Sequence, residues 1–181
     1  MSRPVLWLDS DVARSVRQTR QLAELARTKE IRVVVAAQVH LEQCRQVREN
    51  AARRGVPFVP QKIDELLRQT GIDVEPTTFD RITAEAWAEL LHARYPGEAA
   101  WRQAKLDAVK ARLPEATTPD RVPMATDWLV ALEVERSGGF IAVNDQGPEW
   151  RHLRAHDPPR AMRFEEALAW LKAQPEPPSP R

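Results

Sequence analysis

Cysteine, glycine-rich loops and long apolar runs are missing or nearly missing from this chain of 181 residues. Cys44 is the single cysteine, so an internal disulfide and a cysteine-based zinc site are both excluded. No apolar run approaches the roughly 20 residues that a membrane-spanning helix needs. No glycine-rich phosphate loop is present either, so that way of holding a nucleotide is excluded as well.

An excess of charge of one sign is also missing. The chain carries 27 basic and 26 acidic residues, a formal net charge of +1. Such a balance neither predicts nor excludes nucleic-acid binding, because acids can gather in a pocket with cations around it. The N-terminal segment reaches Asp9 too early to contain the apolar core of a secretory signal. We therefore expect a cytoplasmic protein that does not associate with a membrane.

Apolar runs alternate with helix-like segments along the chain. The run Val5–Leu8 shows no alternation of polar and apolar residues, which is typical of a strand buried on both faces. We expect strands at 5–8, 31–36, 72–76, 140–143 and near 162–164, and helices at 11–28, 38–54, 61–69, 80–94, 98–113, 124–136 and up to 171. Strands that alternate with helices imply right-handed crossovers and a parallel sheet.

The expected fold class is therefore α/β, a three-layer α/β/α arrangement around one central parallel sheet. Residues 1–174 are expected to form one domain with a helical insertion at about 78–115. The proline-rich tail, residues 175–181, is expected to be disordered.

Four acidic residues fall near one edge of this sheet. Asp9 follows the first strand and Asp145 follows the strand at 140–143. Glu42 lies in the first turns of the helix after the second strand, and Asp127 opens the helix that precedes 140–143. Ligands of such sheets bind outside the carboxyl ends of the strands, so we expect the four carboxylates to converge there. A further acid, Asp11, is expected to N-cap the first helix.

Carboxylates held close together raise one another's pKa and destabilise the site unless cations neutralise them. Hard oxygen ligands suit Mg²⁺ or Mn²⁺, which can activate water and stabilise charge on a phosphodiester. The four histidines, His40, His92, His152 and His156, are not spaced as a metal-binding set. We therefore expect a catalytic metal site built from the four acids.

Each acid also has a purely structural interpretation. Asp9 would also suit a helix N-cap, and Glu42 would also suit a solvent-exposed position on a helix. Asp127 suits the positive end of a helix dipole, and Asp145 suits a turn. The common placement of all four at one edge favours a shared site over four separate explanations.

The acidic segments resemble those of a known family. Val-Leu-Trp-Leu-Asp9-Ser-Asp-Val resembles the opening strand of PIN domains, and Val-His-Leu-Glu42 resembles their helix-borne glutamate. Ala-Thr-Asp127-Trp-Leu-Val-Ala-Leu and Gly-Gly-Phe-Ile-Ala-Val-Asn-Asp145 resemble the two later acidic motifs. The resemblance is sharp in residues 5–12 and 124–146, and elsewhere it covers the order of elements.

The resemblance implies a PIN-like fold and a Mg²⁺- or Mn²⁺-dependent endoribonuclease, with Asp9, Glu42, Asp127 and Asp145 as catalytic metal ligands. It also implies RNA as the substrate, and a toxin role in which an antitoxin protein is the partner. A homodimer is a further candidate assembly. Arg102, Lys105 and Arg112 share one face of an expected insertion helix and are candidate RNA contacts, with an ordinary solvated face as the alternative.

Two other functions are open. Asp9 and Asp11 after a strand also fit a haloacid-dehalogenase-like phosphatase, with the first as nucleophile and the second as acid/base. That family has Ser or Thr at the end of the second strand, where this chain has Gln38. It also has a later paired acidic motif, which is missing from this sequence. The other alternative is a non-catalytic PIN-like binding module.

Overall fold

The structure is a computed structural model that describes residues 4–59, 61–75 and 125–177, together with positions 97, 99, 100 and 103. Five strands in these residues form one sheet, and every neighbouring pair is parallel. The strands are β1 (Val5–Leu8), β2 (Arg32–Ala36), β3 (Asp73–Glu75), β4 (Phe140–Ala142) and β5 (Ala161–Met162). They lie in the order β3-β2-β1-β4-β5, which confirms the expected α/β class with a central parallel sheet.

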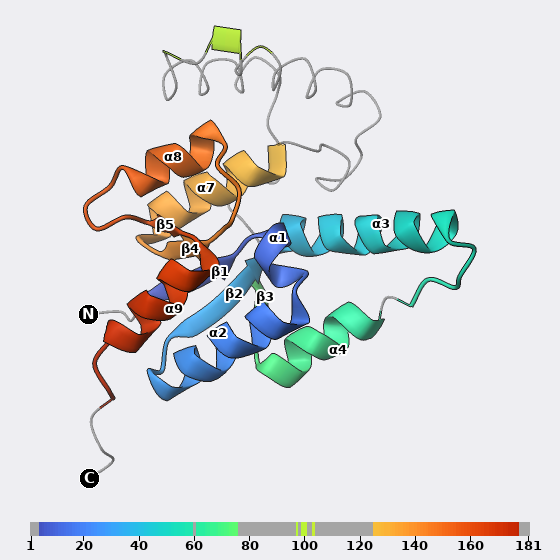
Figure 1. The fold of residues 1–181 in the computed structure, drawn as a ribbon, viewed down its shortest axis with the longest axis horizontal. Helices are drawn as coiled ribbons and strands as arrows, with labels where there is room; N and C mark the ends of the chain where they lie inside the picture. The colour runs from blue at the N-terminus through green and yellow to red at the C-terminus, as the bar shows by residue number, and fades with distance from the viewer. Residues whose placement is uncertain are drawn as a thin grey trace.

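Helices cover both faces of the sheet. They are α1 (Ser10–Ala13), α2 (Val16–Thr28), α3 (Ala37–Arg53), α4 (Gln61–Thr70), α7 (Ala125–Ser137), α8 (Pro148–Arg154) and α9 (Phe164–Ala173). Figure 1 shows α2, α4 and α9 together on one side and α7 with α8 on the other. Right-handed crossovers explain this division, because the chain moves outward from β1 in one direction to reach β3 and in the opposite direction to reach β5.

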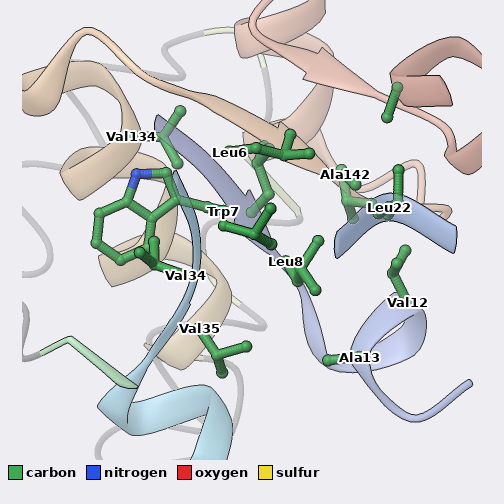
Figure 2. Close-up of a cluster of buried hydrophobic side chains, with 14 of the residues drawn as sticks. Leu6, Trp7, Leu8, Val12, Ala13, Leu22, Val34, Val35, Val134 and Ala142 are labelled. Atoms are coloured by element: carbon green, nitrogen blue, oxygen red, sulfur yellow. The ribbon is translucent and has the colours of Figure 1, made fainter. Parts of the chain in front are cut away.

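The first strand is the centre of the apolar core. Leu6 and Leu8 are fully buried, and the Trp7 side chain between them is also buried. Figure 2 shows the Trp7 ring beside Val34 of β2 and Val134 of α7, whereas Leu22 of α2 lies on the other side of β1. Alternate side chains of a strand point to opposite faces, so a strand covered by helices on both faces needs an unbroken apolar run.

Two glycines link α7 to β4 in a tight turn. Gly138 has a φ of +68°, and its N–H and that of Gly139 donate to the carbonyls of Glu135 and Val134, the pattern of a Schellman motif. A Cβ at Gly139 would lie 2.9 Å from the Val5 carbonyl oxygen and 3.1 Å from Trp7 Nε1. Position 139 therefore needs glycine because β1 passes too close for any side chain.

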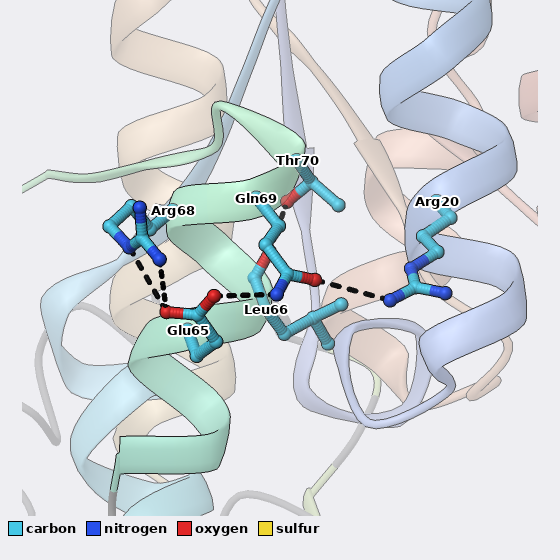
Figure 3. A network of polar contacts seen from close by, with 6 residues as sticks. All are labelled: Arg20, Glu65, Leu66, Arg68, Gln69 and Thr70. Carbon is cyan, nitrogen blue, oxygen red and sulfur yellow. Dashed lines mark hydrogen bonds and ion pairs between the residues drawn. The ribbon is translucent and has the colours of Figure 1, made fainter.

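On the opposite face, α4 is connected to α2 by polar contacts at the surface. Gln69 accepts a hydrogen bond of 3.2 Å from Arg20 Nη2 and donates to Glu65, which also pairs with Arg68, as Figure 3 shows. Exposed pairs of this kind contribute little to stability. The buried side chains of α4, Leu67 among them, hold the helix in place instead.

Among the described residues, the expected elements agree with the observed ones except at three places, one of which is Phe164, expected at the end of the last strand but found as the first residue of α9. The helix expected at 11–28 is divided at residues 14–15 into α1 and α2, and the Ser15 hydroxyl accepts the Gln18 N–H to cap α2. Helix α8 was not expected at all, although Pro148 at its first turn and buried Trp150 and Leu153 three residues apart are helix signals.

Several expectations fall partly or wholly outside the described residues. The helices at 80–94 and 98–113, and with them the helical insertion at 78–115, lie almost entirely there, as do residues 178–181 of the tail. Residues 175–177 form neither helix nor strand. Within the described part of the chain, no helix has both the length and the apolar character needed to cross a membrane.

Candidate active site

The acidic edge lies where the order of the sheet reverses. Strand β1 is followed in sequence by β2 on one side, whereas β4 pairs with β1 on its other side. Such a switch point leaves a crevice at the carboxyl ends of the two central strands. The Asp9 N–H donates to the Ala142 carbonyl over 3.0 Å, so the ends of β1 and β4 are in direct contact at this crevice.

Asp9 is buried at this edge, with 4% of its surface exposed. Its Oδ1 atom is buried and has no hydrogen-bond partner in the described structure. Burial raises the pKa of Asp9 well above its ordinary value, and the negative charges of Asp127, Asp11 and Glu42 raise it further, while the Ser10 N–H opposes the shift. An uncompensated buried carboxylate is costly, so Asp9 needs a proton or a cation.

Asp11 connects α1 to the loop that follows β4. Its Oδ2 accepts the N–H of Asn144 over 2.9 Å and the N–H of Asp145 over 3.1 Å. Its Oδ1 is buried without a hydrogen-bond partner among the described residues. Burial raises the pKa of Asp11, and the N–H donors of Asn144, Val12 and Asp145, together with the Arg14 charge, lower it in part.

The expectation that Asp11 caps the first helix is therefore wrong. The N-cap position belongs to Asp9, and no side-chain capping hydrogen bond is formed there. Asp11 lies inside the first turn of α1, where its carboxylate reaches across to another segment 133 residues later in the chain. The residues next to Asp11 in the sequence give no indication that its side chain would contact this distant segment.

Glu42 and Asp127 approach Asp9 from two different helices, α3 and α7. Both side chains are partly buried, and both contribute negative charge that Asp9 senses. Glu42 Oε1 accepts from Gln46 Nε2 over 2.8 Å, and Gln46 in turn accepts from Arg14 Nη1. Asp127 lies in the first turn of α7, where the positive end of the helix dipole favours a carboxylate.

Asp145 is at the same edge but differs from the other acids. Its side chain is exposed, and its Oδ1 accepts the N–H of the next residue, Gln146, over 2.6 Å. Its backbone N–H reaches Asp11, and its carbonyl accepts from Arg154 Nη2 over 2.8 Å. Residues 143–147 form neither a helix nor a strand nor a turn, and the role of Asp145 as a metal ligand stays a prediction.

The structure therefore brings together the charges of Asp9, Asp11, Glu42 and Asp127, with Asp145 beside them through its backbone. The convergence is loose, because no three of these described acids bring a ligand oxygen each within 4.8 Å of one another. Arg102, Lys105 and Arg112, the expected RNA contacts, lie outside the described residues.

A second group with metal-ligand chemistry lies elsewhere on α7 and α8. Glu135, His152 and His156 each place one ligand atom within 4.8 Å of the other two. The histidines were expected to form no metal-spaced set, yet two of them lie beside a carboxylate at distances that a metal ion could bridge. His152 and His156 are four residues apart, His152 in α8 and His156 just past its end, and this close spacing was a usable signal. The contribution of Glu135, which lies 17 residues from His152 in sequence, depends on the packing of α7 against α8.

Comparison with protein-family models and with curated proteins finds no match for this chain. The resemblance to PIN domains therefore rests on the residues and their placement alone. Chemically, the acidic edge offers hard oxygen donors, two of them buried and unpartnered among the described residues. Donors of that kind fit Mg²⁺ or Mn²⁺ better than a softer transition metal.

Proposed function

We propose that this protein is a Mg²⁺- or Mn²⁺-dependent endoribonuclease of the PIN type, with its active site at the acidic edge of the sheet. The observation that carries the proposal is the Asp9 carboxylate, which is buried with an unpartnered oxygen and faces the negative charges of Asp127, Asp11 and Glu42. Selection for stability alone would replace such a group, because an uncompensated buried charge destabilises the fold. A bound divalent cation would compensate it.

Some of these residues would bind the cation, and others hold the binding residues in position. Asp9 and Asp11 supply the buried unpartnered oxygens, while Glu42, Asp127 and Asp145 supply further carboxylates around them. The Asp11 Oδ2 atom also fixes the loop after β4 through two N–H donors. When bound, the ion supplies an activated water and stabilises negative charge on the phosphodiester.

RNA as the substrate follows from the resemblance and from the charge of the site. A site with four or five carboxylates repels phosphate, so a nucleic acid must be held by cations outside it. Arg102, Lys105 and Arg112 are our candidates for that role, and Arg14 is a cation already beside the acids. An antitoxin partner and a homodimer follow from the resemblance alone.

The test is cleavage of a mixed-sequence single-stranded RNA by the full chain, with Mg²⁺, with Mn²⁺ and with a chelator. We expect metal-dependent cleavage that Asp127→Asn lowers by at least about two orders of magnitude, because the site loses a charge on which electrostatic stabilisation depends. Asp73→Asn is the matched control, since Asp73 is an exposed aspartate at the opposite, amino end of β3.

Assays on the same purified protein also distinguish the two alternative functions, a phosphatase and a non-catalytic binding module. Hydrolysis of a small phosphate ester without RNA cleavage would instead identify a phosphatase that uses Asp9 and Asp11. Saturable Mg²⁺ binding without turnover of either substrate would identify a non-catalytic module. Equal RNA cleavage by wild type and Asp127→Asn would show that the nuclease activity does not come from this edge.

A further inference from the structure

Glu135, His152 and His156 form a compact group at a distance from the acidic edge. Glu135 is in the last turns of α7, His152 is in α8, and His156 lies just past the end of α8. Glu135 and Asp127 are on the same helix, 135 − 127 = 8 residues apart. At about 1.5 Å per residue, this separation is on the order of 12 Å along the helix axis, so the two groups are distinct sites.

One carboxylate oxygen meets two imidazole rings. Glu135 Oε1 lies 3.1 Å from His152 Nε2 and 3.5 Å from His156 Nε2. The two rings lie edge to face with their centroids 5.4 Å apart. The side chains are partly accessible, with 33% exposure for each histidine and 18% for the glutamate. Solvent ions can therefore reach the group.

These separations match the spacing of ligands around zinc. Bonds of about 2.0–2.1 Å in a tetrahedral arrangement place neighbouring ligand atoms about 3.3–3.4 Å apart. The two distances from Glu135 Oε1 fall on either side of that spacing. A set of two imidazoles and one carboxylate is also a known donor set for zinc, with solvent as a further ligand. All three ligand atoms lie within 4.8 Å of one another, so they would only have to draw together around the ion.

We propose that Glu135, His152 and His156 form a binding site for a divalent transition metal, Zn²⁺ by preference, separate from the Mg²⁺ or Mn²⁺ site. Imidazole nitrogen selects zinc and its neighbours over magnesium, whereas the acidic edge offers oxygen alone. The ion would connect α7 to α8 and so hold the segment that follows the loop bonded to Asp11. The chain would then carry two metal sites of different chemistry.

The alternative is a Glu135–His152 hydrogen bond, with His156 close by, that simply joins α7 to α8. A natural comparison is present in the chain, because His40 Nε2 lies 2.8 Å from Asp64 Oδ1, and Cys44 Sγ, 3.9 Å from the same nitrogen, does not complete a compact three-ligand group among the described residues. Such a two-ligand pair is expected to bind zinc far more weakly than a three-ligand group. His40→Gln is therefore the matched control for the histidine substitutions.

The experiment is calorimetric titration of the full chain with Zn²⁺ in excess Mg²⁺, which occupies the acidic edge. We expect one tight equivalent and a rise in melting temperature, because an ion that binds the folded state stabilises it. Co²⁺ in place of Zn²⁺ should give visible absorption bands of a nitrogen- and oxygen-ligated ion. His156→Ala should weaken binding by more than the roughly 10–100-fold typical of losing an outer-shell partner, and His40→Gln should leave it unchanged.

Glu135→Gln is the second variant, since it keeps a hydrogen-bond acceptor for the histidines while it removes the anionic ligand. We expect it to fold as wild type does without metal and to lose the Zn²⁺ equivalent. The proposal is overturned if wild type takes up no Zn²⁺ in excess Mg²⁺. Unchanged Zn²⁺ affinity in both His156→Ala and Glu135→Gln overturns it too, and the group then only joins α7 to α8 through the Glu135–His152 hydrogen bond.

Discussion

Asp9 is a buried acid whose charge destabilises the fold unless a proton or a cation compensates it. It occupies the N-cap position of α1, yet its side chain forms no capping hydrogen bond. The capping explanation for this residue, open from the sequence, is therefore excluded by the structure. Its burial and its three acidic neighbours leave charge compensation as the explanation.

We predict that Asp9 makes the metal-free protein less stable as the pH rises. The raised pKa means that folded Asp9 keeps its proton to a higher pH than unfolded Asp9 does. The folded state then binds more protons, so the free energy of unfolding falls from about pH 4, the ordinary aspartate range, up through the raised pKa. Asp9→Asn should reduce this fall, and chemical unfolding with a chelator at several pH values measures it.

Two comparisons support the interpretation of that measurement. Asp73→Asn, which removes an exposed aspartate, should keep the pH dependence of wild type. Added Mg²⁺ should raise the stability of wild type most at the higher pH, where Asp9 must lose its proton to bind the ion. The same pH slope in Asp9→Asn as in wild type would contradict the assignment of the strain to Asp9.

At the scale of elements, the turn between α7 and β4 lies between residues of both proposed metal sites. It ends the helix that carries Asp127 and Glu135, and it begins the strand that leads to Asp145. The turn depends on Gly138 for its positive φ and on Gly139 for space against β1.

We predict that Gly139→Ala destabilises the fold by about 1–3 kcal/mol, the usual cost of overpacking a core. The added Cβ would meet the Val5 carbonyl and Trp7 Nε1 at distances that force β1 and β4 apart. Gly138→Asn should cost less, under about 1 kcal/mol, since asparagine adopts the left-handed conformation and the nearest side-chain atom is 3.9 Å away. Urea unfolding of both variants makes the comparison, and equal losses would refute the steric explanation.

Elements with strong local patterns were the ones that could be predicted. The strand at 5–8 was expected at the residues where β1 is found. A short unbroken apolar run between polar segments is typical of a buried strand. Helix α8 was missed because a helix of seven residues is too short to show a clear period in the sequence. The division of the helix at 11–28 was missed because Ser15 is a good cap and also an acceptable helix residue.

At the scale of the whole molecule, the proposed function requires cations that hold an anionic substrate beside an acidic site. We predict that replacing Arg102, Lys105 and Arg112 together by Ala weakens RNA binding and reduces its dependence on salt. Fewer released counterions lower the slope by about 0.7 for each lost contact with single-stranded RNA. RNA affinity at several salt concentrations measures this slope, and Mg²⁺ binding should not change.

A matched control removes the same amount of charge from another surface. Arg17, Arg20 and Arg68 are exposed cations of α2 and α4, on the face of the sheet away from α7. Their replacement by Ala should leave the salt slope as it is in wild type. If the two triple variants behave alike, the insertion is an ordinary solvated surface and RNA is held elsewhere.

The sequence by itself determined the fold class and the edge at which the acids gather. Alternating strands and helices require a parallel sheet, and an acid directly after an apolar strand must lie at that strand's carboxyl end. Only the tertiary structure decided which side chains meet. Asp11 reaches residues 144 and 145, and Glu135 meets His152 and His156, because helices and loops distant in sequence pack together. Such contacts depend on packing angles and rotamers that no local pattern encodes.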